Sequence, residues 1–168
     1  MESTLIAGLA GILGLLLGRF WDSRSEAVRW RRDQLIRTYE WIGRAYYVLR
    51  EANRRLALLD PETPEADEAA SRVLDLGGEL NSAIVAVWVH GSTSVATAVR
   101  ELNQETIRMF IAARAQRFSW EEWRTTRGPA DDALDRFVEA VRRELSLPPL
   151  QVSVRIADLP TQADQPEP

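Results

Sequence analysis

The apolar positions of this chain form two patterns, one continuous and one periodic. Near the start, an uncharged apolar run extends from Leu5 to Gly18. From Val28 onward, apolar residues recur at spacings of three and four, which is the period of one face of an α-helix. The sequence therefore predicts an all-α protein, with a single N-terminal transmembrane helix followed by an antiparallel bundle of about four helices.

The apolar run predicts a transmembrane anchor over residues 1–21. A helix of this length spans roughly 31 Å at about 1.5 Å per residue, close to the hydrocarbon thickness of a bilayer. A secretory signal peptide would carry a basic leader and a small-residue cleavage site, whereas this leader carries Glu2. A cleaved signal and a helix buried in a protein core are the alternatives to the spanning anchor that we expect.

Basic residues near the anchor predict its orientation. They lie on its C-terminal side, and positive side chains near a transmembrane end are retained in the cytoplasm. We therefore expect a bacterial inner-membrane protein with its N-terminus outside and its bundle in the cytoplasm. The residues expected at the membrane interface, beside lipid headgroups, are Arg19, Phe20, Trp21, Arg24, Arg29, Trp30, Arg31 and Arg32.

Small residues are dense within the anchor and repeat on one side of the expected helix. In lipid, such a face lets two helices approach closely, which favours a dimer or docking onto a partner's helix. The alternative is that glycine is simply common in transmembrane helices. The residues of this predicted packing face are Ala7, Ala10, Gly11, Gly14 and Gly18.

The periodic part predicts a bundle over residues 22–147. Its first helix continues to Leu59, and Asp60-Pro61 ends it. A second helix begins near Thr63, with Pro64 at its first position. The buried seam expected for the first helix is Leu35, Tyr39, Ile42, Tyr46, Leu49, Asn53 and Leu56.

Two adjacent glycines, Gly77 and Gly78, interrupt the second helix before its C-cap at Gly91. Paired glycines cost about 2 kcal/mol in helix propensity, so they predict either a kink or a bulky neighbour that needs the space. Trp41 or Tyr46 is the neighbour that we expect to fill it.

A third helix is expected from Ser92 to about Phe118. A short helix capped by Ser119 follows and should stop at Gly128, and a last helix starts at Pro129. Residues 148–168 are predicted to be an extended, partly disordered C-terminal tail. Leu150 to Ile156 alternate like a short strand, but without a second strand we expect them to pack extended on the bundle. The residues after Asp158 are polar and rich in proline, which favours disorder.

Composition limits the function more than it defines it. The chain has 168 residues, of which 45% are hydrophobic, and a net charge of −4. This acidic balance disfavours nucleic acid as a partner, because binding phosphates needs a concentrated basic surface.

Candidate chemistry is sparse. His90 is the only histidine, cysteine is absent, and no metal, phosphate-loop or catalytic-triad motif occurs. We therefore expect no catalytic residue, cofactor or metal, and no enzymatic activity. A helical enzyme that uses scattered carboxylates is a distant alternative. The acidic pairs, such as Asp131 with Asp132, fall in first turns of helices, where helix capping accounts for them.

The aromatic residues offer one candidate surface. Phe118, Trp120 and Trp123 cluster where the third helix meets the short one, which suggests a docking surface for a partner protein. The alternative is that these rings close one end of the bundle.

The first fifty residues resemble a group of uncharacterised actinobacterial membrane proteins. The resemblance rests on an anchor with small residues, followed by Trp30-Arg31-Arg32-Asp33 and Tyr39. It implies a single membrane span followed by an Arg-rich helix and a small cytoplasmic bundle.

From these features we expect a non-catalytic, membrane-anchored adaptor or assembly element, which acts by self-association or by binding a protein partner. The alternative of a different class is a membrane-acting effector or phage-exclusion factor, whose bundle perturbs the bilayer through the single span. In both cases membrane lipid is an expected partner.

Overall fold

A computed structural model of the chain describes residue 30 and residues 32–149. The chain divides into two units, Met1–Arg37 and Thr38–Pro168, and each is described by itself. All regular structure in the described residues is helical, which confirms the all-α prediction. The predicted anchor over 1–21 and the tail from residue 150 lie outside the described residues. None of the described helices is both long enough and apolar enough to cross a bilayer.

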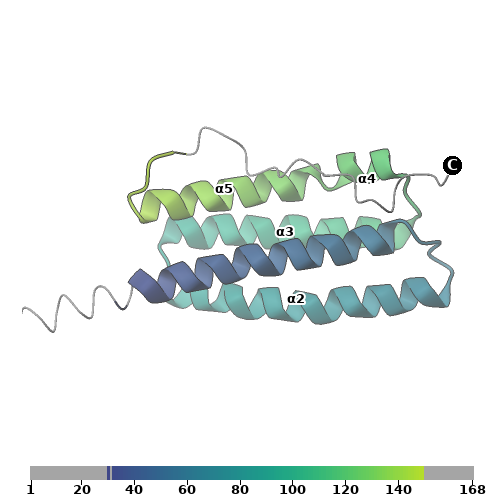
Figure 1. Cartoon of the computed structure of the whole chain (residues 1–168), viewed down its shortest axis with the longest axis horizontal. Helices are drawn as coiled ribbons and strands as arrows, with labels where there is room; N and C mark the ends of the chain where they lie inside the picture. The colour runs from purple at the N-terminus through teal and green to yellow at the C-terminus, as the bar shows by residue number, and fades with distance from the viewer. Residues whose placement is uncertain (1–29, 31, 150–168) are drawn as a thin grey trace, which may run out of the picture. The chain divides into compact units, whose positions relative to one another are not determined.

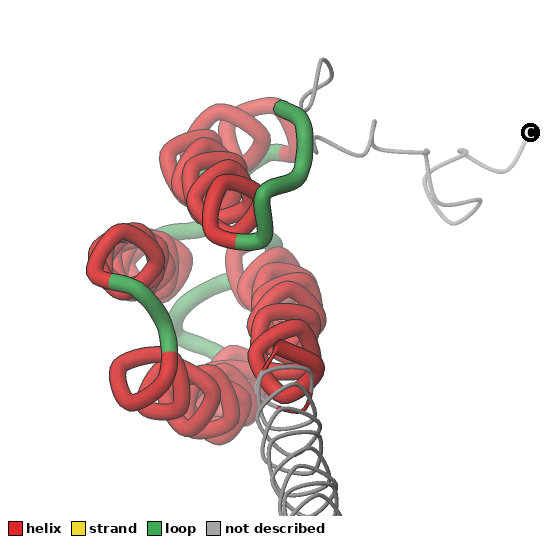
Figure 2. The backbone as a smooth tube through the Cα atoms, turned by 90° about the vertical axis from the view of Figure 1, so that its left-hand side faces the viewer, coloured by secondary structure: helices red, strands yellow, loops and turns green. Residues whose placement is uncertain are grey.

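The bundle consists of long helices that run alternately in opposite directions (Figure 1). The first helix is described over residues 32–57 and carries no label in the figure. Seen end on, the long helices lie around a common centre (Figure 2), which confirms the predicted helical bundle. The labelled helices are α2 (Pro64–His90), α3 (Thr93–Ala115), the short α4 (Trp120–Thr126) and α5 (Gly128–Glu144).

The expected start signals are present at the helix N-termini. Thr63 caps α2 by accepting a hydrogen bond from the backbone N–H of Ala66, and Pro64 occupies the first turn. Ser92 caps α3 in the same way. Ser119 and Glu122 form a reciprocal capping box at α4, and the Ser119 backbone N–H holds the pKa of the Glu122 carboxyl below its usual range.

Two predicted boundaries are wrong. Gly128 does not end the short helix but begins α5, because Arg127 keeps α-helical backbone angles and joins the two helices directly. The third helix ends at Ala115 rather than near Phe118. Gln116 is extended, and the chain then turns so that the Phe118 N–H donates to the Ala57 carbonyl at 2.8 Å.

The core lies along the predicted seam of the first helix. From Tyr39 to Leu56, every expected seam residue is buried, including the polar Asn53. On α2 and α3 the facing positions are mainly small or branched aliphatic residues, such as Ala83, Val87 and Val99. The first helix therefore supplies the bulky side chains, and α2 and α3 close around them.

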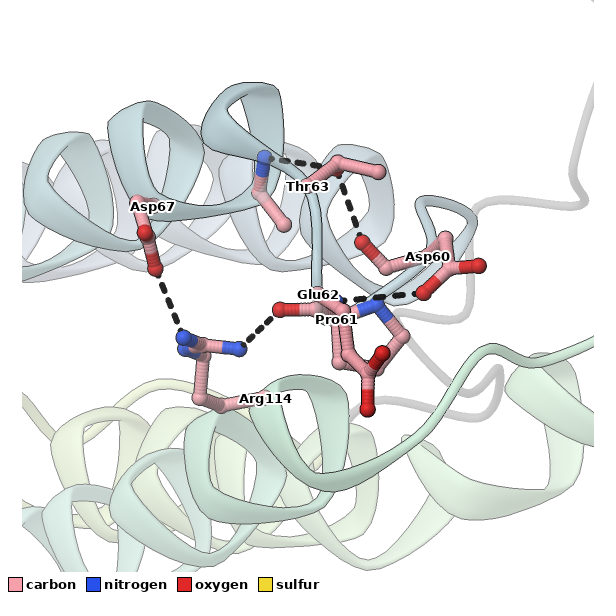
Figure 3. Close-up of polar contacts among 7 residues, drawn as sticks. Asp60, Pro61, Glu62, Thr63, Asp67 and Arg114 are labelled. Atoms are coloured by element: carbon pink, nitrogen blue, oxygen red, sulfur yellow. Dashed lines mark hydrogen bonds and ion pairs between the residues drawn. The ribbon is translucent and has the colours of Figure 1, made fainter.

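The turn from the first helix into α2 is fastened to the end of α3 by Arg114 (Figure 3). The Arg114 guanidinium donates to the Pro61 carbonyl and to the Asp67 carboxylate, both at 2.7 Å. Within the turn, the Thr63 hydroxyl donates to the Asp60 carbonyl at 2.8 Å. Because the short loop around Gly91 joins α2 and α3 at the opposite end, the two helices are fixed to one another at both ends.

Candidate functional site

Gly77 and Gly78 leave open space beside α2. The helix continues through both residues, and a Cβ atom added at either would meet nothing within 4 Å. The predicted occupants lie elsewhere, since Trp41 is 43% exposed and the buried Tyr46 donates its hydroxyl to Asp131. The expectation of a bulky neighbour filling this space is therefore wrong.

The open space belongs to a cavity of about 260 Å³ between the first helix, α2 and α3. Its inner walls are largely aliphatic and aromatic, and include Leu49, Leu80 and Phe110. At its edges lie Leu74, which is 63% exposed, and Ile107, which is 50% exposed. A concave apolar space bordered by exposed apolar side chains is the usual form of a binding site.

Four polar residues, Asn53, Asn81, Asn103 and Thr106, also belong to the lining of this cavity, and Asn53 is the most deeply buried of them. The residue is fully buried, and its Nδ2 donates to the Leu49 carbonyl at 2.9 Å. That bond fixes the amide orientation, because the opposite orientation would place Oδ1 against another carbonyl oxygen. Within the described residues Asn53 Oδ1 has no hydrogen-bond partner. An unsatisfied buried acceptor of this kind costs about 1–3 kcal/mol.

One stripe on the exposed side of α2 is apolar, beside charged residues such as Arg72, Asp75 and Glu79. Leu74, Val85, Trp88 and Val89 are between 54% and 68% exposed. We define the α2 face as the exposed, uncharged stripe that contains Leu74, Gly78, Asn81, Ser82, Val85 and Val89. Exposed apolar residues grouped on one helix face indicate a surface that another protein covers.

A second hollow, of about 670 Å³, lies between the first helix and α2. Charged side chains of both signs border it, including Glu51 and Arg72. Arg54 and Arg55 both pair with Glu51, and the Arg54 guanidinium holds the pKa of the Glu51 carboxyl below its usual range. We therefore regard the cavity beside Gly77 and Gly78 as the stronger candidate site.

Asp131 is the centre of a polar cluster that joins the first helix to α5. It accepts hydrogen bonds from the Tyr46 hydroxyl at 2.8 Å and from Arg50 at 3.3 Å, and Arg127 Nε lies 3.4 Å from its other oxygen. From the sequence, Asp131 was expected only to stabilise the first turn of a helix, and this cluster was not predicted. The buried Tyr46 in the seam was the available signal, because its hydroxyl requires a partner.

The cluster predicts how stability responds to alkaline pH. Burial, reinforced by the Asp131 carboxylate, raises the pKa of Tyr46 well above its ordinary value. In the unfolded chain the hydroxyl of Tyr46 has its ordinary pKa of about 10, whereas in the folded chain its pKa is higher. The resulting stabilisation is fully present below about pH 10 and is lost as the pH rises above that value. We expect the free energy of unfolding to fall more steeply above pH 10 in the wild-type chain than in Tyr46→Phe, by up to about 1.4 kcal/mol per pH unit. Urea denaturation from about pH 9 to 11 measures the two slopes; equal slopes would contradict this assignment.

The predicted partner surface is largely internal. Trp123 is fully buried and Phe118 is 9% exposed, and their rings pack edge to face with centroids 5.9 Å apart. Trp120 is half-buried, and the Arg54 and Arg127 guanidinium groups lie 5.6 and 5.8 Å from its ring centroid. Of these three aromatic residues, only Trp120 presents much surface to a partner.

Two of the predicted membrane-interface residues, Trp30 and Arg32, are exposed. The rest of the predicted interface and the whole predicted packing face lie outside the described residues, namely Ala7, Ala10, Gly11, Gly14, Gly18, Arg19, Phe20, Trp21, Arg24, Arg29 and Arg31.

Over residues 32–149 no three histidine, aspartate or glutamate side chains are grouped closely enough to hold a metal ion. His90 is exposed at the C-terminal end of α2.

No protein-family model matches this sequence, and no curated protein or solved structure is significantly similar to it.

Proposed function

We propose that this protein is a membrane-tethered assembly element, which self-associates when the α2 face of one copy packs against the same face of a second copy. The observation that carries the proposal is the order of residues along this face. Their spacings are four, three, one, three and four, which read the same in both directions.

This symmetry is what a two-fold interface requires. In such a dimer, a residue that contacts a second residue across the interface is itself contacted in the same way. If the two α2 helices pack antiparallel, with the axis between Asn81 and Ser82, Gly78 faces Val85 of the second copy. Leu74 then faces Val89, so that each pair brings apolar or small residues together.

Size and charge on the α2 face also support the proposal. Val85 is 54% exposed, and the open space around Gly78 gives room for a valine side chain from the second copy. Asn81 and Ser82, next to the axis, are polar but uncharged and can hydrogen-bond to one another. No residue of the face carries a charge, so the pairing buries no unpaired ion.

The membrane tether is proposed from residues 1–21. Their uncharged run, followed by arginine and aromatic residues, is typical of a signal anchor. A tether confines all copies to one plane and raises their effective concentration, so that even a small α2 interface would be populated.

Cysteine crosslinking tests the proposed pairing. The chain has no cysteine, so Ser82→Cys creates a single reactive thiol about 1.5 Å along the helix from its counterpart in the dimer. The matched control is Ser71→Cys, which is also exposed on α2 but would lie about 30 Å from its counterpart. We expect Ser82→Cys to form a disulfide-linked dimer on mild oxidation of the full-length chain, and Ser71→Cys to remain monomeric on a non-reducing gel. Equal crosslinking of both variants, or none at Ser82, would contradict the pairing.

A further inference from the structure

We infer that the cavity beside Gly77 and Gly78 receives the indole ring of Trp88 from the second copy. This inference rests on the proposed self-association, and it assigns a specific occupant to the cavity. Trp88 is 58% exposed, although tryptophan is among the most apolar side chains.

The position of Trp88 on α2 fits this role. It follows Leu74 by fourteen positions and Asn81 by seven, so the three residues lie along the same edge of the helix. Leu74 and Asn81 both line the cavity between α2 and α3. Trp88 is therefore on the α3 side of α2, and a two-fold axis across antiparallel helices brings the α3 sides of both copies together.

The register also fits. In the proposed dimer, Trp88 lies opposite Asp75 of the second copy. A helical side chain leans toward the N-terminus of its own helix, here toward the level of Val85. That level faces Gly78 of the second copy, which is an exposed residue of the cavity lining.

The size and lining of the cavity suit an indole ring. A cavity of about 150 Å³ holds benzene, so one of about 260 Å³ has room for a fused two-ring system. Leu74 and Ile107, which are exposed at the edges of the cavity, provide apolar contact for the ring faces.

The test uses 3-methylindole, which is the tryptophan side chain as a free molecule, and the full-length chain carrying Trp88→Ala. Because Trp88 is exposed, this variant should fold normally. We expect it to dimerise at least about 30-fold more weakly than the wild type, as for an interface hot spot. Its empty cavity should bind one 3-methylindole per chain by isothermal titration calorimetry, whereas the wild-type dimer should not bind it.

The outcomes separate this inference from the proposed function. If Ser82→Cys crosslinks but Trp88→Ala dimerises as tightly as the wild type, the α2 pairing stands and the role of Trp88 is wrong. Failure of Trp88→Ala to bind 3-methylindole, or equally tight binding by the wild-type dimer, would also overturn the inference. If Ser82→Cys does not crosslink, the proposed function fails, and the assignment of Trp88 fails with it.

Discussion

Replacing Trp123 by alanine is expected to lower the free energy of unfolding by about 3–5 kcal/mol, the range observed when a large buried aromatic residue is truncated. Trp123 is fully buried and packs against Phe118, whose backbone N–H is bonded to the end of the first helix. Its removal leaves a cavity at the point where α4, the first helix and the chain leaving α3 meet. Urea denaturation of the full-length chain measures the change as a shift in midpoint.

Two further variants show whether the cause is lost volume or a lost hydrogen bond. Trp123 Nε1 has no hydrogen-bond partner among the described residues, so Trp123→Phe removes ring volume but no bond. We expect it to cost roughly half as much as Trp123→Ala. Trp41→Ala, at a tryptophan that is 43% exposed, should cost about 1 kcal/mol or less. A small effect of Trp123→Ala would show that this end of the bundle is not part of the core.

Introducing valine at Gly78 is expected to weaken self-association strongly and to leave the fold of each copy intact. A Cβ at Gly78 meets nothing within its own chain, and valine is a better helix former than glycine. Across the proposed interface, however, the new side chain meets Val85 of the second copy. Overpacking costs about 1–3 kcal/mol per site, and the two-fold axis imposes it twice, so the dissociation constant should rise at least about 30-fold.

The matched control for this change is Gly43→Val. Gly43 lies in the first helix, and a Cβ there also meets nothing within 4 Å. It is not on the α2 face, so its dissociation constant should match that of the wild type. Sedimentation equilibrium in detergent micelles measures both variants; a similar change in both would show that the effect is not specific to α2. All variants keep residues 1–21, so any association of the anchor is common to them.

The elements of the bundle were predictable because their signals are local. Thr63 with Pro64, and Ser119 with Glu122, fix helix starts through hydrogen bonds within a few residues, and the structure has those caps. The buried seam from Tyr39 to Leu56 follows from helical periodicity alone. The prediction at Gly128 is wrong because glycine often ends helices, whereas here Arg127 continues the helical backbone into α5.

The candidate site was not predictable, because it depends on contacts between distant segments. Gly77 and Gly78 lie at the candidate site, but the residues next to them in the sequence do not indicate whether another helix fills the space beside them. Likewise, Asn53 is only one seam position in the sequence, and its unpaired Oδ1 emerges when α2 and α3 pack around the first helix. The exposure of Val85 and Trp88 also required the packed bundle, since both resemble core residues in the sequence.

The most direct test of the proposed self-association exchanges the two residues that are expected to meet. Val85→Gly alone should weaken the dimer because it removes the side chain that faces Gly78, and Gly78→Val alone should weaken it by overpacking. In the double variant, the introduced valine would face the introduced glycine of the second copy, so the interface contains the same two side chains with their positions reversed. We predict that its dissociation constant, measured by sedimentation equilibrium, returns to within about tenfold of the wild-type value. If the effects of the two single changes simply add in the double variant, residues 78 and 85 do not meet, and the proposed α2 interface is wrong.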